Sequence, residues 1–263
     1  MVHICIRSEM NCMLGVAVAL LIKFGSCITD DNDTKYPIAA LVLARGGSKG
    51  IPLKNIVEIQ PNQTLLARAL DTIQHSDVFS SIWVSTDHEQ IAAEASRHGA
   101  EVFARSTMHA QDHSTSLEAT REFLDSHPEI EHFALIQCTS PLLRADYLVQ
   151  AAQQIRSCID NAMGMPSCTF SVVRSYKLRW WEDAKSGLLR AINFDPMARP
   201  RRQDWQGELV ETGMFYFSDR RLIMEMGSFQ NELCTVVEVD ELDALEIDDV
   251  KDLKLARILI GME

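Results

Sequence analysis

The sequence is poor in positive charge. Its 263 residues include 25 Lys and Arg against 37 Asp and Glu, so the formal net charge is −12. Non-specific binding to a nucleic-acid backbone needs clustered cations, so we expect no nucleic-acid partner. With only 12 glycines and 8 prolines, and with 46% hydrophobic residues, the composition excludes collagen and low-complexity disorder. The length predicts one globular domain, or one domain with an appendage.

The sequence also lacks a hydrophobic run long enough to form a stable membrane span. The run Cys12–Ile22 holds eleven uncharged residues, whereas a spanning helix needs about 20. Arg7 precedes this run and small residues follow it, which is the pattern of a secretory signal. We therefore expect a signal peptide or N-terminal anchor over 1–27, a linker over 28–36 and a domain over 37–263. A buried N-terminal helix is the alternative.

Two N-glycosylation sequons agree with secretion. Asn32-Asp33-Thr34 and Asn62-Gln63-Thr64 both lie in polar, turn-rich surroundings. Asn32 and Asn62 are therefore candidate glycosylation sites, although single sequons are also common by chance.

The cysteines lack a metal-binding pattern. The sequence has seven, with no CxxC pair and no metal-ligand spacing, and three of them lie in or beside the signal-like segment. The other four could pair or stay as thiols, and we expect mostly buried thiols. These four are Cys138, Cys158, Cys168 and Cys234.

The rest of the chain alternates between apolar β-type runs and helical stretches. Strands that are apolar along their whole length imply a parallel sheet covered on both faces, so we expect an α/β, Rossmann-like fold. Such sheets bind ligands at the carboxyl ends of their strands. The expected strands are 38–43, 81–85, 101–104, 133–138, 214–217 and 235–239, and the expected helices are 65–74, 89–98, 117–126, 147–158 and 249–259.

The alternation breaks between about residues 174 and 212. Trp180, Trp181 and Trp205 lie here, together with the basic run 199–202. Exposed aromatic residues are suited to a partner surface. We therefore expect an inserted arm.

A glycine-rich loop follows the first expected strand. Residues 44–55 read ARGGSKGIPLKN, with the cations Arg45, Lys49 and Lys54. Three glycines let the backbone curl around a ligand and point N–H groups inward, and the natural guest of such a basic loop is a polyphosphate. The loop matches neither the Walker A pattern nor the dinucleotide fingerprint GxGxxG. A solvated basic turn is the alternative.

The same loop contains a GxSxG pattern, the nucleophile elbow of hydrolases, at 46–50. That elbow must run directly into a helix, and Pro52 disfavours a helical conformation at Ile51. Asp112 and His113 are possible triad partners, but no spacing specifies them. A hydrolase is therefore a weak alternative.

A run of carboxylates precedes the last expected helix. Nine Asp and Glu residues lie among the 21 residues 232–252. Glu246 and Asp248 flank Ile247, so on an extended segment both side chains point the same way. Two carboxylates, phosphate oxygens and water make a Mg²⁺ site, whereas a solvated acidic loop is the alternative. His109 and His113 are spaced for zinc, but no third ligand is marked.

Five collinear motifs carry a family resemblance. The stretch ALVLARGGSKGIPLKNI resembles the N-terminal signature of the CMP-sialic acid synthetases, also called N-acylneuraminate cytidylyltransferases. The resemblance covers about 38–256 and is that of a short animal form without a C-terminal phosphatase-like domain. With the signal-like N-terminus, it implies a protein of the secretory-pathway lumen, in the Golgi. The other matching segments are 83–87, 134–142, 200–205 and 213–216.

The resemblance implies a reaction, a fold and an assembly. The family transfers CMP from CTP to the 2-hydroxyl of a sialic acid, N-acetylneuraminate, and releases pyrophosphate. The cofactor is Mg²⁺ or another divalent cation such as Mn²⁺. The implied fold is a Rossmann-like nucleotidyltransferase with a mostly parallel sheet, and the arm at 174–212 resembles the dimerisation element of a homodimer.

The resemblance also implies roles for individual residues. Arg45, Lys54 and Asp248 are the implied catalytic residues. The implied nucleotide-binding residues are Arg45, Ser48, Lys49, Asn55, Arg105 and Ser116. The implied sugar-binding residues are Gln137, Thr139, Ser140 and Arg202, the last of them reaching a neighbouring subunit. The implied metal ligands are Asp248 and Glu246.

Two positions depart from the family pattern. Glu246 stands where the family has Asp, and Thr212 stands where it has Asn. The longer side chain of Glu246 could alter metal preference or rate. Two alternatives to the family activity therefore remain: a catalytically impaired CTP-binding protein, and a cytidylyltransferase for another keto-sugar acid.

Overall fold

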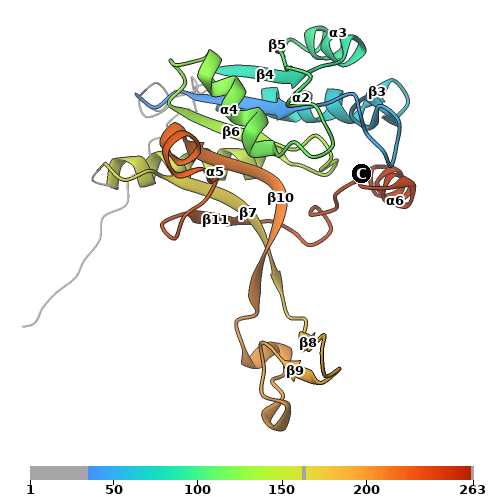
Figure 1. The fold of residues 1–263 in the computed structure, drawn as a ribbon, viewed down its shortest axis with the longest axis vertical. Helices are drawn as coiled ribbons and strands as arrows, with labels where there is room; N and C mark the ends of the chain where they lie inside the picture. Colours follow the sequence, from blue (N-terminus) through green and yellow to red (C-terminus); the bar gives the residue numbers. More distant parts are fainter. Residues whose placement is uncertain (1–34, 162–163, 262–263) are drawn as a thin grey trace, which may run out of the picture.

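The computed structural model describes residues 35–161 and 164–261. A seven-stranded sheet lies at the centre of the fold (Figure 1). The strand order is β11-β7-β10-β6-β1-β4-β5. β10 runs antiparallel to both of its neighbours and every other pair is parallel, so the prediction of a mostly parallel α/β sheet is confirmed. The strands are β1 (Ile38–Leu43), β4 (Ser81–Thr86), β5 (Glu101–Ala104), β6 (His132–Ile136), β7 (Cys168–Ser175), β10 (Glu208–Asp219) and β11 (Thr235–Glu238). The expected signal or anchor segment and Asn32 lie outside the described residues.

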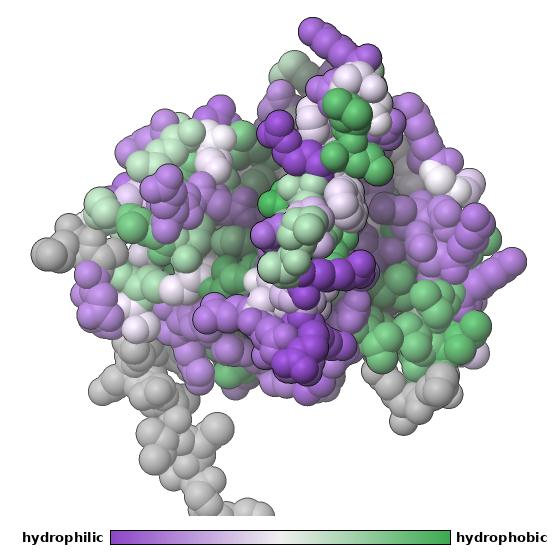
Figure 2. Space-filling view, turned by 90° about the horizontal axis from the view of Figure 1, so that it is seen from below, coloured by the Kyte–Doolittle hydropathy of each residue, from purple (hydrophilic) through white to green (hydrophobic). Residues whose placement is uncertain are grey.

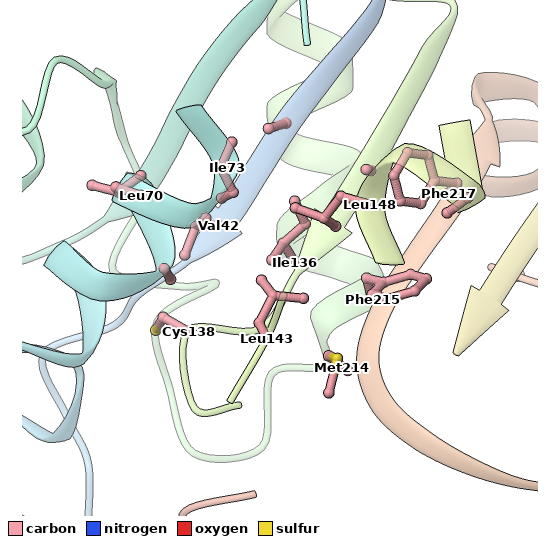
Figure 3. Packing of buried hydrophobic residues seen from close by; sticks show 14 of the residues in the cluster. Val42, Leu70, Ile73, Ile136, Cys138, Leu143, Leu148, Met214, Phe215 and Phe217 are labelled. Atoms are coloured by element: carbon pink, nitrogen blue, oxygen red, sulfur yellow. The ribbon is translucent and has the colours of Figure 1, made fainter. Parts of the chain in front are cut away.

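Helices cover both faces of this sheet. On one face, α2 (Leu65–Ser76), α3 (Glu89–Arg97) and α5 (Ala145–Asn161) pack against alternate strand residues such as Val42 and Ile136 (Figure 3). The other face is covered by α4 (Ser116–Ser126) and by the short π-helical segment η4 (Leu222–Met226). Successive strand side chains point to opposite faces, so strands buried on both sides are mostly apolar along their whole length.

Side-chain caps set where several helices begin. The Thr64 hydroxyl accepts a hydrogen bond from the amide of Ala67 and starts α2. Thr115 and Glu118 form a capping box at α4, and Asp249 and Asp252 form another at α6 (Val250–Ile260). Each box satisfies backbone N–H groups that the first helical turn leaves without partners.

A separate apolar cluster lies beside the carboxyl ends of the strands. It joins Ile51 of the glycine loop to Ile247 of the acidic segment and to Leu253 of α6. The short elements η1 (Lys54–Ile56), β2 (Glu58–Gln60) and β3 (Gln63–Thr64) complete this corner. Burial of these side chains therefore holds the glycine loop and the acidic segment next to each other.

The irregular segment expected at 174–212 forms an arm that projects from the sheet (Figure 1). β7 and β10 lead into it, and its outer part contains β8 (Trp180–Glu182), β9 (Leu189–Ala191), η2 (Pro196–Ala198) and η3 (Arg202–Asp204). We use "arm" for residues 176–207. β7 was not expected from the sequence, and only residues 214–217 of β10 were expected as a strand. A register irregularity between Glu211 and Tyr216, with Gly213 at a φ of 75°, interrupts the strand pattern there.

The expectation that the cysteines stay mostly as buried thiols is wrong for one pair. Cys168 and Cys234 form a disulfide, Cys138 is a buried free thiol and Cys158 is a partly buried one. β11 pairs in parallel with β7, with Thr235 opposite Thr169, and this register brings the two sulfur atoms together. Sequence spacing could not reveal a contact that depends on strand order.

Among the described residues, no helix combines the length and the apolar character that crossing a bilayer requires.

Candidate active site

A cavity of about 230 Å³ opens where β1, β5 and β6 end. Loops from distant parts of the chain meet there because the carboxyl ends of parallel strands share one edge of the sheet. The sequence-predicted residues in its wall are Arg45, Ser48, Lys54, Asn55, Arg105, Ser116, Gln137, Thr139 and Glu246.

The glycine loop is held at two close approaches. The amide of Gly46 donates a hydrogen bond to Asp87 Oδ1 at 2.8 Å, and a Cβ at this position would lie 2.8 Å from the ring of His88. A Cβ on Gly50 would lie 2.6 Å from the carbonyl oxygen of Asp248. Both positions therefore need glycine for space, and the loop is positioned before any ligand arrives.

Lys54 is a fixed cation in the wall of the cavity. Its Nζ donates to the carbonyl oxygen of Ile247 at 2.7 Å and lies 3.4 Å from Asp248 Oδ1, with 18% of the side chain exposed. Because the ammonium is anchored to the backbone, it requires little reorganisation to face a negatively charged reactant.

Arg105 and Asn55 are buried polar residues in the same wall, each 7% exposed. The Arg105 guanidinium donates to both the hydroxyl and the carbonyl of Ser85. Burial lowers the pKa of Arg105 to about 10, against the opposing charges of Asp87 and Glu122, so the group stays cationic at neutral pH.

The amide of Asn55 is oriented by two neighbours. Its Nδ2 donates to the Arg45 carbonyl at 3.0 Å, and its Oδ1 accepts from the thiol of Cys138 at 3.2 Å. Burial raises the pKa of that thiol to about 12, which keeps it protonated and therefore a donor. The two contacts fix which side of the amide faces the cavity.

The two acidic candidates lie close together but differ in setting. Glu246 lines the cavity and accepts from the Thr139 hydroxyl at 3.3 Å, whereas the Asp248 side chain is 79% exposed beside Lys54. Desolvation first, and the charge of Asp248 second, raise the pKa of the Glu246 carboxyl. A cation between these two groups would relieve both effects.

The donor set fits Mg²⁺ and does not fit an all-protein metal cage. Among the residues that the structure describes, no group of three or more His, Cys, Asp or Glu side chains could hold a metal ion. This rejects the zinc interpretation of His109 and His113 for that part of the chain. Mg²⁺ commonly binds through one or two carboxylates together with substrate phosphates and water.

Four sequence-predicted residues do not line the cavity. Lys49 is exposed and pairs with Asp112, and Asp248 lies at the entrance beside Lys54. Ser140 is 3% exposed and lies behind the wall. Arg202 belongs to the arm, where its guanidinium stacks over the Tyr176 ring at 4.7 Å beside a separate cavity of about 380 Å³. The cavity of one chain thus contains no part of its own arm among the described residues.

Sequence reasoning missed several residues that build the site. His109, Ser114 and Thr115 line the cavity, and they belong to the loop between β5 and α4. Asp87 was seen only as part of a motif, and its hydrogen bond to Gly46 was not expected. The position of this loop directly after a strand, at the same edge as the glycine loop, was the signal that could have found it.

The hydrolase interpretation of the glycine loop does not fit the geometry. After Ser48 the chain makes a turn, with Leu53 at a φ of 49°, before the short η1 begins. A nucleophile elbow instead places its serine on a sharp turn that enters a helix directly. Ser48 therefore does not stand in a nucleophile elbow, although it lines the cavity.

The fold and this site together define a class of α/β protein whose strand ends carry a basic glycine loop, an anchored lysine and a carboxylate pair, an arrangement suited to a phosphorylated ligand. Comparison with known families then narrows the class. The model of the cytidylyltransferase family matches residues 39–255, and the chain belongs to this family.

Two curated relatives are similar over most of this chain. N-acylneuraminate cytidylyltransferase A of Danio rerio is 44% identical over 213 residues, which cover 80% of this chain and 48% of that protein. N-acylneuraminate cytidylyltransferase of Oncorhynchus mykiss is 43% identical over 198 residues, which cover 74% and 44%. The chain therefore spans about half the length of the curated relatives it matches.

A solved structure shares the fold. The CMP:2-keto-3-deoxy-manno-octonic acid synthetase complexed with CTP has a TM-score of 0.61 and 14% identity, with coverage of 86% of this chain and 99% of that chain. At this identity the likeness concerns the fold alone.

Proposed function

We propose that the protein transfers CMP from CTP to the 2-hydroxyl of a sialic acid, N-acetylneuraminate, and releases pyrophosphate. The observation that carries the proposal is the cavity at the strand ends, where the anchored Lys54 faces the same space as Arg45 and Glu246. The names of the relatives from Danio rerio and Oncorhynchus mykiss point to the same reaction.

Each group in the cavity has a role in this scheme. Arg45 and Ser48 bind the triphosphate together with Lys49, which lies outside the cavity wall and is exposed to solvent. Lys54 stabilises the negative charge that develops at the α-phosphate. The remaining wall residues then divide between the two substrates. Asn55, Arg105 and Ser116 position the nucleotide, and Gln137 and Thr139 contact the sugar. Ser140 is buried behind the wall, so it is not assigned a contact with the sugar.

Glu246 and Asp248 are the residues that would hold Mg²⁺, or another divalent cation such as Mn²⁺. When bound, the metal would supply positive charge to the phosphates and would assist ionisation of the attacking hydroxyl. The two carboxylates of this chain would hold it. Glu246 also lies beside Gly213, where a Cβ would be 3.6 Å from its Oε2, so the longer side chain fits beside the bulge of β10.

The proposal includes a homodimer formed through the arm. Trp180 and Trp181 are 50% and 49% exposed, and Met197 is 93% exposed. Figure 2, viewed from below, shows hydrophobic and hydrophilic residues side by side on the arm. In such a dimer Arg202 of the arm serves the site of the neighbouring subunit.

We place the protein in the lumen of the secretory pathway, in the Golgi. The signal-like segment and the two sequons support this location. Asn62 is exposed on the turn between β2 and β3, where an attached glycan would point into solvent. The Cys168–Cys234 disulfide also supports it, because such bonds persist mainly in oxidising compartments.

The test is pyrophosphate release by the purified protein in the presence of CTP, N-acetylneuraminate and Mg²⁺, with each component omitted in turn. The proposal requires release that depends on all three. If the protein binds CTP but releases no pyrophosphate with any sugar acid or divalent metal tested, it is a catalytically impaired CTP-binding protein. Release with a different keto-sugar acid, and none with N-acetylneuraminate, would reassign the substrate.

A further inference from the structure

The carboxylate of Asp112 bridges two cations of the glycine loop. Its Oδ1 lies 2.7 Å from Arg45 Nη1, and its Oδ2 lies 2.6 Å from Lys49 Nζ. The side chain of Asp112 is 43% exposed and that of Lys49 is 79% exposed, so both remain open to solvent and to a ligand. These are the two cations that the proposed function assigns to the triphosphate.

Asp112 belongs to the loop between β5 and α4, which has its own internal support. The amide of Ser106 donates to Glu122 Oε1 at 3.0 Å, and the Ser114 hydroxyl donates to the Met108 carbonyl at 2.8 Å. Thr115 ends the loop with the capping box of α4. These contacts hold the loop without Asp112, so its carboxylate can be removed while the loop keeps its place.

The charge arrangement at Asp112 matches that of a bound phosphate. Two oxygen atoms of a single anion each face one cation, and both cations keep the pKa of the Asp112 carboxyl below its usual range, Lys49 first and Arg45 second. A triphosphate or pyrophosphate presents several such oxygens and more charge, so it can replace the carboxylate. The carboxylate in turn competes with the phosphates whenever they dissociate.

We propose that Asp112 is an anionic placeholder: it occupies the phosphate-binding cations before CTP arrives and again as pyrophosphate leaves, and so weakens the binding of both. The inference rests on the proposed function, because it assumes that Arg45 and Lys49 bind phosphates. In this role Asp112 limits how long pyrophosphate stays bound to Arg45 and Lys49. Such a residue favours turnover, because pyrophosphate is highly charged and would otherwise dissociate slowly from two cations.

The opposite role for Asp112 makes the opposite prediction. If the carboxylate oriented Arg45 and Lys49 for productive binding, its removal would weaken the affinity for phosphates. The placeholder role requires tighter binding after the same change. The direction of the effect therefore separates the two.

The experiment compares the Asp112→Asn variant with the wild-type full-length protein by isothermal titration calorimetry. Inorganic pyrophosphate and CTP are titrated separately, with Mg²⁺ present and sugar absent. We expect both ligands to bind about three- to tenfold more tightly, because two solvent-exposed ion pairs no longer compete. Asp112→Ala should behave in the same way, because it also removes the charge.

The matched control is Asp125→Asn, an exposed carboxylate on α4 whose removal changes the net charge equally. Tighter binding in both variants would assign the effect to net charge and overturn the inference, as would unchanged or weaker binding in Asp112→Asn. Thermal melting checks that each variant is folded. If the wild-type protein binds neither pyrophosphate nor CTP, it is the proposed function that fails.

Discussion

The cavity wall and the arm differ in what surrounds their side chains. In the wall, Asn55 and Arg105 are each 7% exposed and make hydrogen bonds to neighbouring backbone carbonyls. On the arm, Trp180 is 50% exposed and Met197 is 93% exposed. The polar side chains of the wall find partners within their own chain. The arm instead leaves large apolar side chains exposed to water, where burial would be favourable.

This difference in burial reflects how each region is positioned: the cavity by the core of the sheet, and the arm by only two strands. The cavity is shaped by the core beneath it, since β1 and β6 lie at the centre of the sheet between two helical layers. The arm instead extends from β7 and β10, beyond the last residues of these two strands that pair with each other (Figure 1). We therefore expect changes in the wall to alter chemistry within one subunit and changes on the arm to alter assembly.

The strongest test of the wall is Asp248→Ala. We expect turnover to fall by about 10³-fold while weak CTP binding remains, because the proposed metal loses a ligand although the phosphate-binding cations stay in place. Initial rates of pyrophosphate release and CTP titration measure the two effects. Asp125→Ala is the control, and full activity of Asp248→Ala would refute the metal assignment.

Lys54→Ala sharpens the same comparison by separating binding from rate. We expect kcat to fall by about 10²- to 10³-fold, with a much smaller change in the affinity for CTP, because the anchored ammonium stabilises charge that develops during reaction. Steady-state kinetics gives kcat and calorimetry gives the CTP affinity. Lys254→Ala, on the exposed side of α6, is the control. Equal effects on both quantities would contradict a transition-state role.

Cys168→Ser tests the body of the sheet away from both the cavity and the arm. We expect the free energy of unfolding to drop by about 2–4 kcal/mol, because the disulfide closes a long loop in the unfolded chain. The kcat at 25 °C should not change. Denaturant unfolding measures the loss, with Cys158→Ser as the control. A reducing agent should abolish the difference between wild type and Cys168→Ser, and a persistent difference would show that the disulfide is not its source.

The test of the arm is the double variant Trp180→Ala with Trp181→Ala. We expect the dimer dissociation constant to rise by about tenfold or more, because buried tryptophans contribute strongly to interfaces. Sedimentation velocity over a range of concentrations measures it. Leu255→Ala with Ile258→Ala removes exposed apolar side chains from α6 and should leave assembly unchanged. If the arm variant dissociates no more readily than this control, the arm is not the dimer interface.

Much of the sheet could be predicted because the apolar composition of its strands indicates that they are buried. β1 is apolar throughout and β6 is apolar after His132, which only a strand covered on both faces requires. β7 was missed because its sequence CTFSVVRS mixes polar and apolar residues, and its polar members Thr169 and Ser171 are nonetheless fully buried. Their hydroxyls bond Thr235 and Thr212, contacts that local sequence does not reveal.

The candidate site divides in the same way. Arg45 and Lys54 could be picked out because cations beside glycines are unusual in an acidic chain. The partners of these cations could not be picked out. Asp112 looked like a possible triad member and instead faces Arg45, and Ile247 contributes its carbonyl to Lys54 from 193 residues away.

The sequence by itself determined the alternation of strands and helices, the basic glycine loop and the carboxylates near the C-terminal helix, because each is a local pattern. Only the tertiary structure decided that β10 runs antiparallel inside the sheet, that Cys168 meets Cys234, and that Asp112 bridges two loop cations. The physical reason is that strand order brings together residues far apart in the chain, and their contacts depend on how the whole core packs.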